Sequence, residues 1–425
     1  MDIRDGIKKI EDGIHDSLLL NLYDASELDM QRARYTALLD RHSSETGFSG
    51  AELFSTPGRT ELGGNHTDHN QGKVLAAAIH LDTLAAVTPS ENMVVRVNSE
   101  GYPSVVVDLS HLDPIPEEKG RTDALVRGIA ARFINKGWKI GGFTATTTTR
   151  VLKGSGLSSS AALEVLIGTI FNVLYNEGAV STTDIAMAGQ YGENVFFGKP
   201  CGLMDQVACA NGGLVKIDFK DKNHPVIEAL DYSFRKEGFS LLVVDTGGNH
   251  ADLTPEYAAI PEEMKQAAAL TDSEILGQTS ETDLLPHIKE HRKEIGDRAI
   301  LRGLHFFREN RRVSSMIDAL STQNFDEYLK LVQASGDSSF KFLQNVYASS
   351  APDEQGISLA LALTEGFLEG TGACRVHGGG FAGTIQVYIP TEKTEEYTTF
   401  MEGFFEKGCV TELKVRTRPT CRIMG

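Results

Sequence analysis

The spacing of hydrophobic residues predicts helices and strands that are mixed along the chain. Apolar positions at helical spacing predict helical segments over residues 3–41, 123–136, 161–175, 183–197 and 283–347, a helix starting at Pro261 and an amphipathic segment over 358–368. Short β-prone runs predict strands at residues 51–55, 92–97, 104–109, 143–151, 240–245 and 384–389. Three glycine-rich stretches interrupt this pattern, and they carry the candidate chemistry.

The central glycine-rich stretch runs from Val151 to Val165, where a β-prone run leads into glycines, three consecutive serines and an apolar helix. Glycines let backbone N–H groups turn toward a ligand, and the first turn of a helix adds unpaired N–H groups and a positive dipole end. These features predict a phosphate site, beside which serine hydroxyls can ligate Mg²⁺. The alternative is an ordinary Ser/Gly helix cap. A Walker A loop is excluded, because Gly-Lys-Ser/Thr is missing at the required spacing.

The first glycine-rich stretch, residues 56–73, combines glycine and proline with many side chains that form hydrogen bonds. Because helix and strand breakers recur so often, we expect a structured loop and neither a regular helix nor a central strand. Such a loop suits a polyol or sugar. One alternative is a metal site on His66 and His69, although adjacent loop ligands rarely reach tetrahedral geometry without a distant partner. Solvated side chains without function are another.

The last glycine-rich stretch, residues 370–383, contains Gly378, Gly380 and Gly383 at GxGxxG spacing. A dinucleotide-binding fold needs a helix directly afterwards, whereas residues 384–389 are a predicted strand. The Rossmann interpretation therefore fails. A tight glycine loop between a helix and a strand still indicates that something approaches its backbone closely.

Two acidic residues lie on either side of a Gly/Pro break at residues 198–202. Glu193 lies near the end of the predicted helix over 183–197, and Asp205 follows the break near the start of another helix. On local sequence alone, Asp205 is either a helix cap or a functional carboxylate.

Composition and charge limit the class of protein. The 425 residues allow two domains and a substantial core. A net charge of −17 argues against a surface for nucleic acid or for an anionic membrane. The five cysteines form no CxxC pair, Met1–Ile10 lacks an apolar signal region, and apolar runs stay well short of a membrane span. We therefore expect a cytoplasmic protein with free thiols.

Taken together and in this order, the three motifs resemble those of the GHMP small-molecule kinases, and the first resembles the galactokinase branch. The matching segments are Pro57-Gly58-Arg59 and Gly64-Asn65-His66-Thr67-Asp68 (sugar signature), Gly154-Ser155-Gly156-Leu157-Ser158-Ser159-Ser160 (ATP loop), Cys201-Gly202-Leu203-Met204-Asp205-Gln206, and Gly378-Gly379-Gly380-Phe381-Ala382-Gly383 (third motif). Glu193 stands at the expected distance upstream of Asp205. The resemblance covers nearly the whole chain.

The resemblance implies a two-domain α+β fold with the active site in the cleft. A mixed α/β domain that binds sugar and ATP would span residues 1–222, and a ferredoxin-like GHMP kinase domain would span 223–425. The implied activity is ATP-dependent phosphorylation of a sugar's anomeric hydroxyl, most simply galactose to galactose 1-phosphate. ATP and Mg²⁺ are the implied cofactors, the partners are small molecules, and the protein is expected to be a monomer.

Carried over residue by residue, the resemblance implies a role for each site residue. Asp205 would serve as base or hydrogen-bond acceptor at the anomeric hydroxyl, with Arg59 beside it and beside the transferred phosphoryl group. Ser160 and Glu193 would hold Mg²⁺, with Ser158 or Ser159 as further candidates. The residues that would contact sugar hydroxyls are Asn65, His66, Asp68, Gly202 and Tyr257. An ion pair about 4 Å apart is worth roughly 4 kcal/mol at an effective dielectric near 20, so Arg59 would keep Asp205 ionised.

The sequence departs from the family inside the sugar signature. The family usually has Asn where Glu61 stands, Ile at Gly63, Glu at Asn65 and Tyr at His69. The glutamate normally accepts a hydrogen bond from the sugar's primary hydroxyl, whereas an amide carries no charge and would not repel a carboxylate. Galacturonate, or another related sugar, is therefore an alternative substrate.

An alternative from another class is a non-catalytic sugar sensor. Such a protein could lose its catalytic groups. The presence of Arg59, Glu193, Asp205 and an uninterrupted serine run argues for the kinase.

Overall fold

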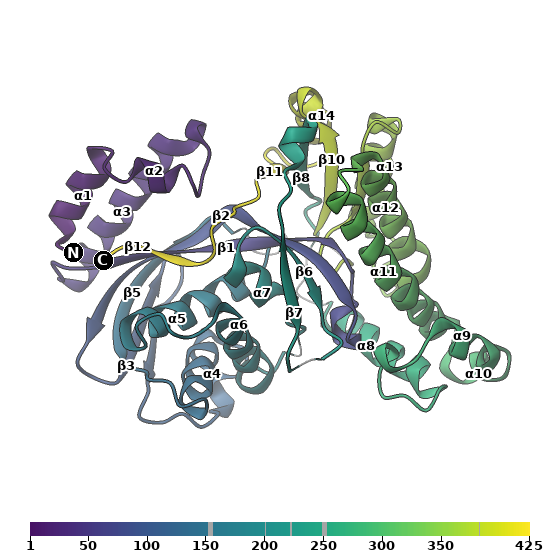
Figure 1. Cartoon of the computed structure of the whole chain (residues 1–425), viewed down its shortest axis with the longest axis horizontal. Coiled ribbons are helices and arrows are strands. Elements are labelled where there is room, and N and C mark those ends of the chain that lie inside the picture. The colour runs from purple at the N-terminus through teal and green to yellow at the C-terminus, as the bar shows by residue number, and fades with distance from the viewer. Residues whose placement is uncertain (152–155, 200, 222, 249–252, 382) are drawn as a thin grey trace.

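The computed structural model describes residues 1–151, 156–199, 201–221, 223–248, 253–381 and 383–425. In these residues the strands form one eight-stranded and one four-stranded sheet, both flanked by helices (Figure 1). The strands are β1 (Glu52–Gly63), β2 (Lys73–Ser90), β3 (Val94–Ser99), β4 (Val105–Asp108), β5 (Gly142–Thr149), β6 (Leu214–Asp218), β7 (Val226–Leu230), β8 (Phe239–Asp245), β9 (Ala373–Val376), β10 (Thr384–Pro390), β11 (Val410–Leu413) and β12 (Cys421–Met424). The α-helices are α1 (Ile3–Glu11), α2 (Asp16–Leu19), α3 (Leu28–Thr46), α4 (Thr122–Asn135), α5 (Ser159–Tyr175), α6 (Thr182–Tyr191), α7 (Met204–Asn211), α8 (Thr254–Ala269), α9 (Glu281–Leu284), α10 (Ile288–Ile295), α11 (Asp297–Ser321), α12 (Phe325–Ser338), α13 (Gly356–Leu368) and α14 (Thr394–Glu402). Two π-helices, η4 (Gly192–Phe197) and η8 (Ser339–Leu343), extend α6 and α12.

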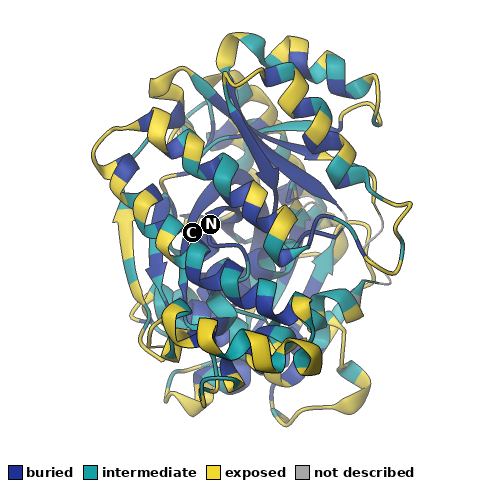
Figure 2. Ribbon diagram, turned by 90° about the vertical axis from the view of Figure 1, so that its right-hand side faces the viewer, coloured by how far each residue is buried: buried dark blue, intermediate teal, exposed yellow. Residues whose placement is uncertain are grey.

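The larger sheet has the order β12-β1-β2-β5-β3-β4, and β6 pairs with β2 and β7 with β6. Successive residues of a strand point to opposite faces, so each face can pack on its own set of helices. Leu53 and Leu84 pack with α1–α3, whereas the next residues, Phe54 and Ala85, belong to the core shared with α4–α7. Figure 1 shows these two helical groups on opposite sides of the sheet, and the chain ends lie side by side in Figures 1 and 2.

The smaller sheet is antiparallel, in the order β11-β8-β10-β9. Alternate residues of β8 again divide between two cores: Leu242 and Val244 pack with α13 and α14, while Leu241 and Val243 pack with the core that includes α11 and α12. Strands β8, β9 and β10 are buried along most of their length, whereas the edge strand β11 is mostly half-buried. Among the described residues, no helix is both long enough and apolar enough to cross a membrane.

The structure corrects two sequence predictions. Residues 56–63, expected to be part of a loop, continue β1 beyond its pairing with β12 and pair with β2. Register shifts between Pro57 and Arg59 and between Glu61 and Gly63 absorb the residues that were expected to end the strand. Helix α8 starts at Thr254, ahead of the predicted start, and Pro261 lies inside it. The domain boundary at 222/223 stays a prediction; β7 and β12, which both follow it, pair with the larger sheet.

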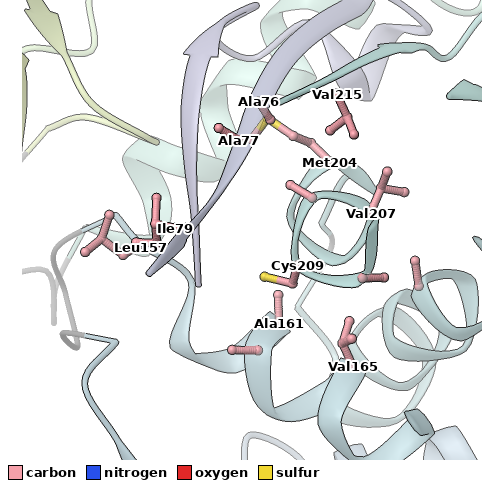
Figure 3. Packing of buried hydrophobic residues seen from close by; sticks show 14 of the residues in the cluster. Ala76, Ala77, Ile79, Leu157, Ala161, Val165, Met204, Val207, Cys209 and Val215 are labelled. Atoms are coloured by element: carbon pink, nitrogen blue, oxygen red, sulfur yellow. The ribbon is translucent and has the colours of Figure 1, made fainter. Parts of the chain in front are cut away.

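Small residues let helix α7 pack tightly beneath the sheet. Figure 3 shows Met204, Val207 and Cys209 of α7 between β2, at Ala76 and Ala77, and α5, at Ala161 and Val165. These residues are almost completely buried. The packing fixes the start of α7, which carries Asp205, against the start of α5.

Candidate active site

The centre of the candidate site is an ion pair between Arg59 of β1 and Asp205 in the first turn of α7. The Arg59 Nε donates to Asp205 Oδ1 at 2.7 Å and Nη2 donates to Oδ2 at 2.6 Å. This two-point geometry is the strongest form of a carboxylate–guanidinium contact. The Arg59 side chain is 6% exposed and that of Asp205 is 32% exposed, so the carboxylate is still open on one side.

The surroundings of Asp205 decide its charge. Burial by itself would raise the pKa of this carboxyl group, but the Arg59 guanidinium and the Ser158 hydroxyl more than offset burial, and the pKa is lowered from its ordinary value. Asp205 is therefore ionised at neutral pH and can accept a hydrogen bond or a proton.

The central glycine-rich stretch approaches this ion pair through its described residues. The Arg59 guanidinium donates to the Gly156 carbonyl, and the Arg59 backbone N–H donates to the Leu157 carbonyl at 3.1 Å. Ser158 takes the N-cap position of α5 at φ 57°, and its hydroxyl donates to Asp205 instead of capping the helix. The first N–H groups of this 17-residue helix are thus not used by that hydroxyl, as a phosphate site requires. The predicted ATP-loop residues Gly154 and Ser155 lie outside the described residues.

Glu193 lies on the π-helix η4, a local irregularity that often marks functional sites. Lys199 Nζ is 3.4 Å from its Oε1, and the Gln206 side chain donates to its Oε2 at 3.1 Å. The same Gln206 nitrogen donates to Glu164 Oε2 at 2.9 Å.

Glu164 is a fully buried acidic residue that the sequence analysis missed. It follows Ser160 by four residues on α5, so both lie on one face of that helix. Burial and the nearby Glu193 raise the pKa of Glu164. Its Oε1 and the Gln206 Oε1 find no hydrogen-bond partner among the described residues. Buried oxygen atoms of this kind fit a hard cation such as Mg²⁺ close by.

Two predicted sugar ligands, Asp68 and Gly202, are in contact. A Cβ at position 202 would overlap the Asp68 carboxylate, so any other residue there would force the Asp68 side chain to move. Asp68 Oδ1 also accepts the backbone N–H of His69 at 3.0 Å. Because Gly202 lies three residues before Asp205, this contact joins the sugar signature to the segment that carries the ion pair.

The other three predicted sugar ligands each donate to a carbonyl of the third glycine motif. Asn65 Nδ2 donates to the Gly378 carbonyl at 2.6 Å, His66 Nε2 lies 3.1 Å from the Gly379 carbonyl, and the Tyr257 hydroxyl donates to the Gly380 carbonyl at 2.8 Å. The expected close approach to this loop is confirmed, since a Cβ at Gly379 would lie 2.5 Å from the Tyr257 ring.

Asn65 is fully buried, and protein atoms satisfy its amide. Its Nδ2 also lies 3.2 Å from both carboxylate oxygens of Glu61, and its Oδ1 accepts from Asn345 Nδ2 at 2.7 Å. Its role as a sugar ligand stays a prediction. Glu61 in turn forms a buried ion pair with Arg375 at 2.6 Å. Asn345 and Arg375 could not be recognised from the sequence, because each acts through a contact more than 270 positions away in the chain.

Comparisons with known proteins agree with this geometry. The family model described as the galactokinase galactose-binding signature matches residues 40–89, and that of the GHMP kinases N terminal domain matches 124–213. A galactokinase of Actinobacillus pleuropneumoniae serotype 3 is 28% identical over 375 residues, which cover 86% of this chain and 92% of the relative. A galactokinase of Streptomyces coelicolor is 29% identical over 358 residues, covering 83% and 88%.

Solved structures share the fold. The crystal structure of Lactococcus lactis galactokinase complexed with galactose has a TM-score of 0.76 at 21% identity, covering 91% of this chain and 99% of that one. The Methanococcus jannaschii mevalonate kinase has a TM-score of 0.60 at 15% identity, covering 86% and 98%. With both signature motifs matched and relatives that align over most of their length, the chain is similar to the GHMP kinases and, among them, to the galactokinases.

Proposed function

We propose that the protein is an ATP-dependent sugar 1-kinase that converts galactose and ATP into galactose 1-phosphate and ADP. The observation that carries the proposal is the two-point ion pair between Arg59 and Asp205, which lies against Ser158 at the start of α5. A carboxylate held ionised next to a helix N-terminus suits the transfer of a phosphoryl group to a hydroxyl. The galactokinases to which the chain aligns support galactose as the acceptor.

In this proposal the two residues of the ion pair have different catalytic roles. Asp205 accepts the hydrogen bond of the anomeric hydroxyl and takes its proton as the new bond forms. Arg59 orients that carboxylate and places positive charge where charge develops on the phosphoryl group. Because the transition state of phosphoryl transfer is loose, positioning and charge stabilisation contribute more than proton removal.

We propose that Mg²⁺ is held by Ser160 and Glu193. When bound, the cation would neutralise charge on the phosphate oxygens of ATP. Lys199 lies 3.4 Å from Glu193 Oε1 and the Gln206 amide donates to its Oε2, so both groups hold the Glu193 carboxylate in position.

The polarity of the site favours a neutral sugar over a uronate. Burial and the neighbouring His69 lower the pKa of His66 to about 3, so its ring is neutral. The contact of Nε2 with the Gly379 carbonyl requires the proton on Nε2, which leaves Nδ1 as an acceptor. Asp68 and Asp205 are also acceptors. Three acceptors match the hydroxyl donors of galactose and oppose the carboxylate of galacturonate.

The test is ADP release, measured with a coupled assay on galactose, galacturonate and other hexoses. We expect rapid turnover on galactose and at most weak turnover on galacturonate. A phosphorus NMR spectrum of the product should show the phosphate coupled to the anomeric proton. Sugar binding by calorimetry without ADP release from any sugar would refute the kinase and favour a sensor.

A further inference from the structure

The third glycine loop, defined here as Gly378–Gly380, has its three carbonyl groups occupied by side chains from the sugar side of the site. Asn65, His66 and Tyr257 each contact one of them. These donors come from the end of β1 and from α8, which are almost 200 residues apart. The backbone of the third glycine loop is thus the common frame on which these side chains are oriented.

The same loop also contacts the ATP side. A Cβ at Gly378 would lie 3.4 Å from the Cα of Gly156, and one at Gly156 would lie 2.9 Å from His377 Nδ1. His377, which precedes the loop, is within 3.0 Å of the Thr60 hydroxyl on β1. The third glycine loop therefore lies between the ATP loop and the predicted sugar ligands, in contact with both.

Asn345 joins the third glycine loop to the sugar signature. It is fully buried, and its Nδ2 donates to Asn65 Oδ1 at 2.7 Å and to the Gly379 carbonyl at 3.1 Å. Its backbone carbonyl accepts the N–H of Phe381 at 2.5 Å, and a Cβ at Gly380 would overlap this carbonyl. One residue thus forms hydrogen bonds to the loop at Gly379, to Phe381 directly after the loop, and to the sugar signature at Asn65.

The contacts of Asn65 explain why the Asn345 amide matters. The NH₂ group of Asn65 donates to the Gly378 carbonyl and to Glu61. The Asn65 Oδ1 is the atom of this amide that accepts a hydrogen bond. Asn345 supplies the shorter of its two donors, at 2.7 Å; the Ser339 hydroxyl lies 3.5 Å away. Without the Asn345 NH₂ group, the buried Asn65 oxygen would keep only the longer contact with Ser339, and the Gly379 carbonyl would lose one of its donors. Leaving buried acceptors with fewer hydrogen bonds is unfavourable.

We propose that Asn345 is a positioning residue for the sugar site, because it fixes Asn65 and the Gly379 carbonyl that holds His66. The third glycine loop, which contacts both the sugar signature and the ATP loop, couples the two sites. The inference rests on the proposed function, because it assigns the sugar to this side of the loop. It predicts that Asn345 affects sugar binding, and that sugar and nucleotide affect each other's affinity through the loop.

The test is Asn345→Asp, which keeps the shape of the side chain and replaces its NH₂ group by an acceptor facing two acceptors. We expect the KM for galactose to rise about 10- to 100-fold, from the loss of donors to buried groups, with a smaller change in kcat and in the KM for ATP. In calorimetry, the effect of a non-hydrolysable ATP analogue on galactose affinity should be present in the wild-type protein and lost in the variant.

A matched control is Asn172→Asp near the far end of α5, where a buried amide donates to the Val180 carbonyl at 3.0 Å. This variant should lose thermal stability but keep the KM for galactose. If Asn345→Asp folds poorly, Asn345→Ser removes the amide without adding a charge and should shift the KM in the same direction. An unchanged galactose KM in a folded variant, or equal losses in all three kinetic parameters, would overturn the inference.

Failure of the inference is distinguishable from failure of the proposed function. Wild-type protein that phosphorylates galactose while both Asn345 variants keep its KM contradicts the inference alone. Wild-type protein that binds galactose without releasing ADP contradicts the function, and the calorimetric comparison still decides whether Asn345 orders the sugar site.

Discussion

Removing the Arg59 side chain is the sharpest test of the mechanism. Arg59→Ala breaks two hydrogen bonds to Asp205, at 2.7 and 2.6 Å, and a third to the Gly156 carbonyl of the ATP loop. It therefore removes the positive charge at the reacting centre, one of the groups that lower the pKa of Asp205, and one of the two links between Arg59 and the ATP loop, while the backbone N–H of residue 59 can still donate to the Leu157 carbonyl. We expect the loss to fall mainly on kcat.

The size of the loss follows from the kind of contact. Removing one preorganised donor from a site where charge develops costs about 100- to 1,000-fold in kcat, or roughly 3–4 kcal/mol. Because Arg59 makes three contacts, we expect Arg59→Ala to lie at or beyond the upper end of that range. Asp205→Asn keeps the size of the side chain and leaves the Arg59 charge in the site, although it removes the base and at least one of the two hydrogen bonds from Arg59. Its loss should therefore be no larger.

The assay is ADP release at saturating galactose and ATP, with thermal unfolding to verify the fold. Arg292→Ala is a matched control: Arg292 forms the same two-point pair with Asp297, at 2.9 and 2.8 Å, on the exposed surface. Its removal should leave kcat unchanged, as expected for a surface pair. Near-normal kcat in Arg59→Ala, or a far larger loss in Asp205→Asn, would refute the mechanism.

Three further predictions test separate parts of the structure. Gly202→Ala should raise the KM for galactose at least 10-fold, because its Cβ would overlap Asp68, whereas Gly366→Ala, with open space around it, should be neutral in the same kinetic assay. Glu193→Gln should raise the Mg²⁺ concentration needed for half-maximal turnover and weaken Mn²⁺ binding measured by electron paramagnetic resonance. Burial alone would raise the pKa of Glu309, but His305, Arg312 and Arg375 lower it to about 2. The lowered pKa means that ionised Glu309 stabilises the fold by about 3 kcal/mol at pH values above 4.5, and this stabilisation is lost as the pH falls from 4.5 toward 2. The unfolding free energy of Glu309→Gln should therefore fall less over that range than the unfolding free energy of the wild-type protein. An equal fall in both proteins would contradict this assignment.

The sequence was a good guide to elements whose local pattern agrees with their surroundings. The predicted strand at 384–389 and the predicted helix at 123–136 match β10 and α4 to within about one residue. The sequence predicted no strand at β2, and it was wrong at β1, where glycine and proline argued for a loop across 56–63. Pairing with β2 outweighs local propensity there, and the register shifts accommodate the glycine and proline residues around Arg59. Local sequence does not contain that information.

Prediction of the site followed the same division. The resemblance pointed to Arg59 and Asp205, and the structure brings them together. It did not point to Glu164 or Asn345, since nothing in the local sequence distinguishes a buried polar residue in a helix or turn from an exposed one. Their partners are known only when the chain is folded, because long-range contacts decide them.

The departures at positions 61 and 65 are best understood together. The family usually has Asn at the first and Glu at the second, whereas this chain has Glu61 and Asn65, and the two side chains lie 3.2 Å apart. Amide and carboxylate have therefore exchanged places within one contact. One carboxylate is lost at position 65 and one is gained at position 61, so the two positions together carry the same formal charge as in the family, and Arg375 forms an ion pair with Glu61 at 2.6 Å. A substrate preference inferred from Asn65 alone would point to a uronate, whereas the pair gives no electrostatic reason to expect one.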